Sequence, residues 1–208
     1  MNFRVLTVSR EFGSGGGRIA KMVAEQLGWK LLDSELIEAI ARAGHVDPKV
    51  VSQLDEHVES WLRRMNRQAM RGAALAAGVV PDKETCFDPD VMNELSRQII
   101  EQAYADGNCV IVGRGAQCIL RNRQDVFHVF VFAPLRERME RLKKRLEPGA
   151  DTAQRIRTVD GERARYLQQH FGKSWCEMHL YDLMISSKED EDETARVILY
   201  AMTGKTRS

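Results

Sequence analysis

Residues 10–18, which read Arg-Glu-Phe-Gly-Ser-Gly-Gly-Gly-Arg, have the composition of a loop that binds a phosphate group. An apolar run, Phe3 to Val8, precedes them, and a run with helical spacing, Ile19 to Leu27, follows. Glycines in a turn between a strand and a helix let backbone N–H groups converge on an anion, and the helix dipole favours negative charge there. We therefore predict an anion-binding loop formed by Gly13, Ser14, Gly15, Gly16 and Gly17.

The loop departs from the usual phosphate-binding motif, G-x-x-x-x-G-K-[ST], which supplies a lysine for the β- and γ-phosphates and a hydroxyl for Mg²⁺. Neither residue stands in its expected place. Arg10 and Arg18 flank the turn, and either could bind two phosphate oxygens or be a solvated surface residue. Ser14 could supply a hydroxyl to a metal ion. The alternative is a tight turn that needs glycine only for packing, although three consecutive glycines are costly to order.

Two further candidates directly follow predicted strands. Asp33 follows residues 29–32 and could bind Mg²⁺ or accept the proton of an acceptor hydroxyl; otherwise it shares a helix cap with Ser34. Arg114 follows the buried-type run 109–112 and has glycine on both sides, which permits close approach to a ligand. The alternative for Arg114 is an ion pair at the edge of the core.

The segment 136–165 is rich in basic residues, and its first part, 136–145, is best interpreted as a solvated helix. Asp55, Glu56 and His57 could line an acceptor site, but a solvated face is the simpler interpretation. The histidines and cysteines have no spacing typical of metal ligands, so we expect no structural metal and a reduced, cytoplasmic setting.

Short apolar runs typical of strands alternate along the chain with segments of helical spacing, and this alternation predicts an α/β fold. Strands are expected at 4–8, 29–32, 109–112, 126–132 and 183–185, and helices at 19–27, 34–42, 48–72, 90–104, 135–145, 152–170 and 191–202. Residues 73–89 are best described as a loop with a helical fragment. This alternation implies a parallel sheet covered on both faces, with ligands bound at the carboxyl ends of its strands.

Composition excludes several classes of protein. The 208 residues suit one α/β domain, and a hydrophobic fraction of 43% excludes a disordered chain. The net charge of +1 gives no argument for nucleic-acid binding, and no apolar run is long enough for a membrane span. The N-terminus has no signal-peptide pattern.

Several segments together resemble one family. They are residues 6–16, 24–33, 108–116 and 160–166, followed by Gly172-Lys173 and Tyr181-Asp182-Leu183, and in this order they resemble the cytidylate kinase-like family of bacterial P-loop proteins. The resemblance implies a P-loop NTPase-type three-layer sandwich with a parallel sheet, a helical insertion that binds the nucleoside monophosphate, and a lid. The core would comprise residues 1–34, 106–135 and 180–208, the insertion about 35–105, and the lid about 136–170.

The same resemblance implies an ATP-dependent phosphotransferase that acts on a small phosphate acceptor. ATP would lie on residues 13–17 with Arg10 and Arg18 beside it, and Mg²⁺ near Ser14 and Asp33. The acceptor would lie between the insertion and Arg114. Arg163 or Arg165 would close over the transferred group, and only one of them can point inward because residues i and i+2 face different ways on a helix.

The chain differs from true cytidylate kinases at five positions, which keeps two alternatives open. Gly16 stands in place of the lysine, Arg18 in place of Ser/Thr and Arg10 in place of glycine; Gly115 replaces an aspartate and Ala39 an arginine. A nucleotide-binding regulatory protein that has lost transfer is the first alternative. A scaffold without a ligand is the second, and it leaves the three glycines unexplained. A homodimer could form through the long amphipathic helix that carries Trp61 and Met65.

Overall fold

The computed structural model describes residues 3–33, 89–144 and 151–204. The chain divides into two compact units, one formed by Met1–Asp33 with Gly107–Ser208 and the other by Ser34–Asp106. Of the second unit the described part is the helix α5 (Pro89–Asp106). The helices predicted at 34–42 and 48–72, nearly all of segment 73–89, and the candidates Ala39, Asp55, Glu56, His57, Trp61 and Met65 lie outside the described residues.

The first unit is built on a sheet of five parallel strands in the order β2-β3-β1-β4-β5. The strands are β1 (Val5–Arg10), β2 (Lys30–Leu32), β3 (Cys109–Val112), β4 (Val126–Phe132) and β5 (Leu183–Ser186). Strand β1 is central, and its Val8 is in register with Val112 of β3 and Val129 of β4. The predicted parallel sheet is confirmed, and the carboxyl ends of β1, β2 and β3 lie at one edge.

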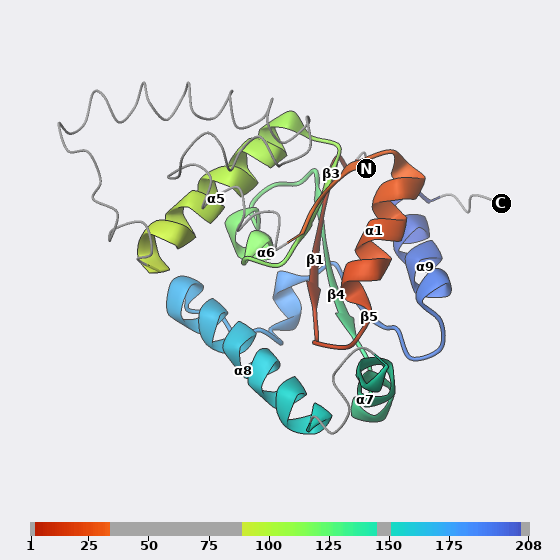
Figure 1. Ribbon diagram of the computed structural model, residues 1–208. Coiled ribbons are helices and arrows are strands. Elements are labelled where there is room, and N and C mark those ends of the chain that lie inside the picture. The colour runs from red at the N-terminus through yellow and green to blue at the C-terminus, as the bar shows by residue number, and fades with distance from the viewer. Residues whose placement is uncertain (1–2, 34–88, 145–150, 205–208) are drawn as a thin grey trace, which may run out of the picture. The chain divides into compact units, whose positions relative to one another are not determined.

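One face of the sheet is covered by α1 (Gly16–Leu27) and α9 (Glu191–Thr203), which lie side by side (Figure 1). Both helices place apolar residues at intervals of three and four, which gives each a single stripe to bury. These apolar stripes pack against the side chains of β1, β3 and β4 on the same face of the sheet. The fully buried members of this cluster include Leu6, Ile19, Val23, Val110, Val129, Ala195 and Ile198.

The opposite face carries α6 (Ala116–Ile119) and α8 (Thr152–Phe171). Here Phe130 of β4 packs edge-on against Trp175, with ring centroids 5.3 Å apart, and Leu167 of α8 and Leu180 of the 3-10 helix η2 (Met178–Leu180) complete the cluster. With α7 (Leu135–Lys143) following β4, the unit is a three-layer α/β/α sandwich. In the described part of the chain no helix combines the length and apolar character needed to cross a bilayer.

The boundaries around the glycine loop differ from those predicted. Strand β1 extends to Arg10 rather than Val8, and α1 begins at Gly16 rather than Ile19. Apolar periodicity could not locate this start, because glycine carries no side chain to mark the buried face. Gly16 and Gly17 therefore lie in the first helical turn, where backbone N–H groups have no partner within the helix.

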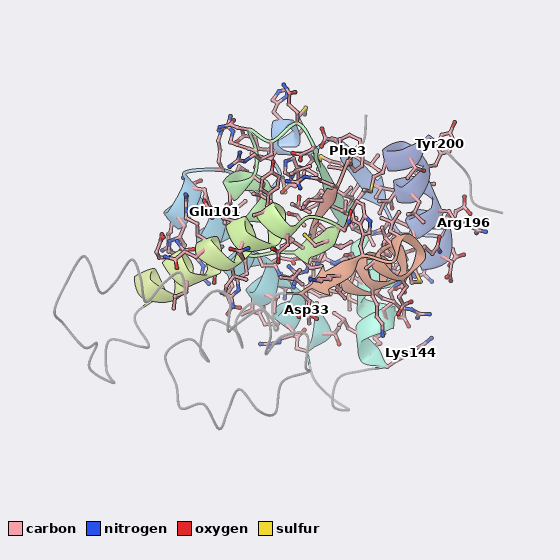
Figure 2. All side chains as sticks on the ribbon, turned by 90° about the horizontal axis from the view of Figure 1, so that it is seen from above. Phe3, Asp33, Glu101, Lys144, Arg196 and Tyr200 are labelled. Atoms are coloured by element: carbon pink, nitrogen blue, oxygen red, sulfur yellow. The ribbon has the colours of Figure 1, made fainter. Side chains whose placement is uncertain are left out.

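The packing of α9 makes a stability prediction. Ile198 is fully buried against the sheet, whereas its neighbour Val197 is 38% exposed, on a helix whose Arg196 and Tyr200 project outward (Figure 2). Ile198→Ala should lower the free energy of unfolding by about 2–5 kcal/mol because it leaves a cavity. Val197→Ala, the matched control, should change it by about 0.5 kcal/mol or less. Urea denaturation measures both, and equal losses would contradict this packing.

Candidate functional site

The glycine loop (residues 11–17) connects β1 to α1 and offers several unused hydrogen-bond donors. Gly15 caps α1 in the left-handed conformation, with φ 80°, and a Cβ there would collide with the Glu191 carboxylate. Some backbone N–H groups are already used: that of Phe12 donates to Asp160 and that of Ser14 to the Glu11 carbonyl. Within the described residues four others donate to no acceptor, those of Gly13, Gly15, Gly17 and Arg18. An anion is the ligand that such a set of donors fits.

Arg10 explains why position 16 is glycine. A Cβ on Gly16 would lie 2.5 Å from the Arg10 Cβ and 3.0 Å from its Cγ, closer than atoms can approach. The guanidinium of Arg10 reaches Gly113, at the carboxyl end of β3, where a Cβ would collide with it. The Arg10 side chain therefore passes beneath the first turn of α1 toward β3. Arginine at 10 and a longer side chain at 16 exclude each other in this conformation.

Arg138 of α7 fastens the first half of the loop. Its side chain is 6% exposed, and its Nη1 lies 2.9 Å from Oε2 of Glu11. The Arg138 Nε donates to the Phe12 carbonyl at 2.8 Å, and Nη2 forms an ion pair with Asp160. Asp160 in turn accepts the Phe12 N–H at 2.8 Å. The Arg138 cluster (Glu11, Arg138, Asp160) thus binds both the N–H and the C=O of one loop residue.

Arg141, one turn further along α7, fastens the second half. Its Nη1 donates to the Ser14 carbonyl at 3.0 Å, and the buried Ser187 hydroxyl donates to the same oxygen. Glu191, at the start of α9, lies beside Gly15 with its Oε2 3.4 Å from the Arg18 Nε and its Oε1 3.9 Å from the Arg141 Nε. The loop is therefore attached to α7 and to the β5–α9 connection, and a carboxylate stands at its rim.

The two predicted lid arginines of α8 diverge, as their spacing requires. Arg163 donates from Nη1 to the Arg10 carbonyl at 2.8 Å, and its guanidinium carbon lies 5.8 Å from the centre of the Phe12 ring. Burial lowers the pKa of Arg163, and the neighbouring Asp160 carboxylate opposes that effect. Arg165 is exposed and donates to the Gly161 carbonyl of its own helix. Of the two, Arg163 is the arginine that contacts the loop.

Asp33 and Arg114 lie at the ends of two neighbouring strands. Asp33 directly follows β2. The adjacent strand β3 ends at Val112, and Arg114 follows it after Gly113. Arg114 has the left-handed φ of 54°, which is uncommon for a residue with a side chain. Burial raises the pKa of Tyr166 on α8, and the positive charge of Arg114 opposes that rise. Both residues make polar interactions within the protein.

The interpretation of 136–145 as a solvated helix is wrong for two of its arginines. Arg136 and Lys144 are exposed, but Arg138 is buried and Arg141 is only a quarter exposed. The available signal was their spacing, since 138, 141 and 142 share one helical face and Leu142 is apolar. Their partners are loop carbonyls and distant carboxylates, which residue types alone do not reveal, and Glu11, Ser187 and Glu191 were missed for the same reason.

The loop residues do not fit a Mg²⁺ ion. The Ser14 hydroxyl is fully buried; it donates to the Glu11 carbonyl at 2.9 Å and accepts the Gly16 N–H at 3.3 Å. Arg18, which stands in place of the Ser/Thr of true cytidylate kinases, is a cation. Among the described residues no group of three His, Cys, Asp or Glu side chains could bind a metal ion. The metal role of Asp33 stays a prediction.

The family model and the curated relative that match this chain agree on one family. A family model described as the cytidylate kinase-like family matches residues 5–189. The cytidylate kinase of Methanosarcina mazei is 26% identical over 187 residues, which are 88% of this chain and 87% of that protein.

Solved structures agree on the fold. An uncharacterized protein from Eubacterium ventriosum has a TM-score of 0.68 at 20% identity and covers 97% of this chain and 98% of its own. A gluconokinase from Sinorhizobium meliloti 1021 has a TM-score of 0.53 at 12% identity and covers 99% and 95%. At these identities the structures are evidence for the fold alone.

The Arg138 cluster makes a second stability prediction. Arg138→Met should lower the free energy of unfolding by about 3–5 kcal/mol, because it leaves the carboxylates of Glu11 and Asp160 without their shared cation. Arg136→Met, an exposed arginine of the same helix, should change it by about 0.5 kcal/mol or less. Arg138→Lys should recover only part of the loss, because an ammonium lacks the planar fork. Denaturant unfolding tests all three, and equal effects of the first two would refute a buried role for Arg138.

Proposed function

Because the chain belongs to the cytidylate kinase-like family, we propose that it is an ATP-dependent phosphotransferase that acts on a small acceptor. The observation that carries the proposal is the set of four N–H groups, on Gly13, Gly15, Gly17 and Arg18, that donate to no acceptor within the described residues. They lie at the N-terminus of α1, where the helix dipole also favours the nucleotide's phosphates. The named relative in Methanosarcina mazei is a cytidylate kinase, which makes CMP the first acceptor to test.

Arginines would supply the positive charge that phosphoryl transfer needs, since the loop does not fit Mg²⁺. Catalysis of this reaction consists mainly of positioning and of stabilising charge on the transferred group. Arg10 passes Gly16 and reaches Gly113, next to Arg114, and Arg163 lies over the Phe12 ring. Both guanidiniums stay charged at any physiological pH. Arg163 is the lid residue in this proposal.

Asp33 and Arg114 form the acceptor side in this proposal. Arg114 would bind an anionic group of the acceptor, and Asp33 would accept the proton where the attacking group is a hydroxyl; the phosphate of a nucleoside monophosphate attacks without such a proton. The attacking oxygen bonds to the γ-phosphorus while the bond from that phosphorus to the bridging oxygen breaks, without a phosphoenzyme. The cytoplasmic location and the homodimer stay predictions.

A nucleotide-binding regulatory protein is the second candidate, and one observation favours it. The Arg10 side chain excludes a lysine at position 16 in this conformation, so the usual contact to the β- and γ-phosphates cannot form. Nucleotide binding needs only the N–H donors, whereas transfer also needs a cation at the moving group. The two candidates therefore agree on ATP binding and differ on turnover.

ATP binding tests what both candidates share. Gly15→Ala should weaken ATP binding about tenfold or more, equivalent to about 1.4 kcal/mol, because its Cβ meets Glu191 and its φ is unfavourable for a side chain. The matched control is Gly161→Ala in α8, where a Cβ has no neighbour within 4 Å and the affinity should stay within about twofold. Isothermal titration calorimetry measures both. Absence of ATP binding by the natural protein would refute the proposed function.

Turnover separates the two candidates. Arg163→Ala should slow phosphoryl transfer about 10²-fold or more with little change in ATP affinity, because the arginine acts on charge that develops during transfer. Arg155→Ala, an exposed residue of the same helix, should leave the rate within about twofold. The assay measures ADP formation with CMP and then with other nucleoside monophosphates. Tight ATP binding with no turnover on any acceptor would favour the regulatory candidate instead.

A further inference from the structure

We propose that the glycine loop binds the phosphate groups of the nucleotide without a divalent cation, and that the guanidinium of Arg18 takes the place of the metal. The inference rests on the proposed function, since it concerns how the same loop recognises its nucleotide. It starts from the disagreement between a family associated with Mg²⁺ and a loop whose residues do not fit that ion.

The one hydroxyl of the loop is unavailable as a metal ligand. Mg²⁺ requires oxygen ligands in a near-ideal octahedron and usually takes them from carboxylates, phosphates and water. Ser14 is fully buried, and its hydroxyl both donates to Glu11 and accepts from Gly16, two bonds that keep the loop in shape. Turning this hydroxyl toward a metal would leave the Glu11 carbonyl and the Gly16 N–H without these partners, which is costly in a buried site.

Arg18 brings a permanent positive charge to the loop. It lies in the first turn of α1, beside the N–H donors of the loop, and its side chain is 62% exposed. Its Nε lies 3.4 Å from the Glu191 Oε2, and within the described residues its two Nη atoms donate to no acceptor. Glu191 therefore restrains the guanidinium at the loop while its terminal donors remain available for phosphate oxygens.

The charges around the loop are consistent with a guanidinium in place of a metal ion. Arg10 passes beneath the loop, Arg141 bonds the Ser14 carbonyl and Arg163 bonds the Arg10 carbonyl, so three more guanidiniums lie around residues 10–18. The nearby carboxylates of Glu11, Asp160 and Glu191 are each paired with an arginine, so the guanidiniums around the loop would repel a divalent cation placed among them. The same guanidiniums can neutralise a polyphosphate by themselves, since arginine does not lose its proton in proteins.

The test compares ATP binding in Mg²⁺ with ATP binding in EDTA, by calorimetry on the full chain. The natural protein should bind with affinities within about threefold of each other in the two buffers. Arg18→Thr removes the guanidinium and introduces the hydroxyl that true cytidylate kinases have at this position; it should weaken binding in EDTA about tenfold, the size expected for loss of one charged hydrogen bond. The matched control is Arg196→Thr, an exposed arginine of α9 that pairs with Glu193 and should change neither affinity.

The results that would contradict this inference can be distinguished from those that would contradict the proposed function. Binding in Mg²⁺ that weakens more than about tenfold in EDTA would overturn this inference and leave the proposed function intact. Equal affinities of Arg18→Thr and the natural protein in EDTA would overturn the role of Arg18. No ATP binding in either buffer would refute the proposed function, and this inference with it. Because Arg18 is largely exposed, unchanged circular dichroism and unfolding of the variant would exclude misfolding as the cause of a loss.

Discussion

The buried guanidinium of Arg138 is the interaction on which the geometry of the site depends. A charge with 6% exposure is tolerated only when it is paired and its donors are used, and Arg138 meets this condition with Glu11, Asp160 and the Phe12 carbonyl. These partners come from the β1–α1 loop and from α8, while Arg138 itself is on α7. One side chain therefore joins the glycine loop to two helices that lie more than a hundred residues further along the chain.

The position of α8 relative to the loop follows from this interaction. Asp160 accepts the Phe12 N–H and pairs with Arg138, so α8 is attached to the loop at a point one turn from Arg163. That attachment places the Arg163 guanidinium over Phe12 and within hydrogen-bonding distance of the Arg10 carbonyl. Arg163 is thereby held against residues 10–12 by a hydrogen bond and a ring contact.

The departures from the usual phosphate-binding motif form one set rather than several separate losses. Arg10 needs the space that a side chain at 16 would occupy, and Arg18 pairs with a glutamate that needs the space beside Gly15. Positive charge is thus present on both sides of the loop, but it comes from guanidiniums at other positions. The backbone donors, which depend on glycine conformation and on the helix start, are retained. Fold and family are shared with kinases, whereas function must be decided by these particular groups.

The parallel sheet, the succession of strands and helices along the chain and the family could all be predicted from the sequence, whereas the order of strands within the sheet was not predicted. Run 109–112 is apolar without interruption, run 126–132 is apolar except for His128, and the helices between them carry one apolar stripe each, so local pattern was sufficient. The glycine loop and the direction of Arg163 relative to Arg165 also followed from local rules. The start of α1 did not, because glycine carries no burial signal.

Only the tertiary structure decided which of the basic residues in 136–145 are buried. Exposed Arg136 and buried Arg138 are chemically identical, and what separates them is a set of partners more than a hundred residues away in Glu11 and Phe12. The engagement of the Ser14 hydroxyl and the collision between Arg10 and a side chain at 16 are of the same kind. Burial of a charge depends on whether distant donors and acceptors meet it in space, and residue types and spacing do not contain that information.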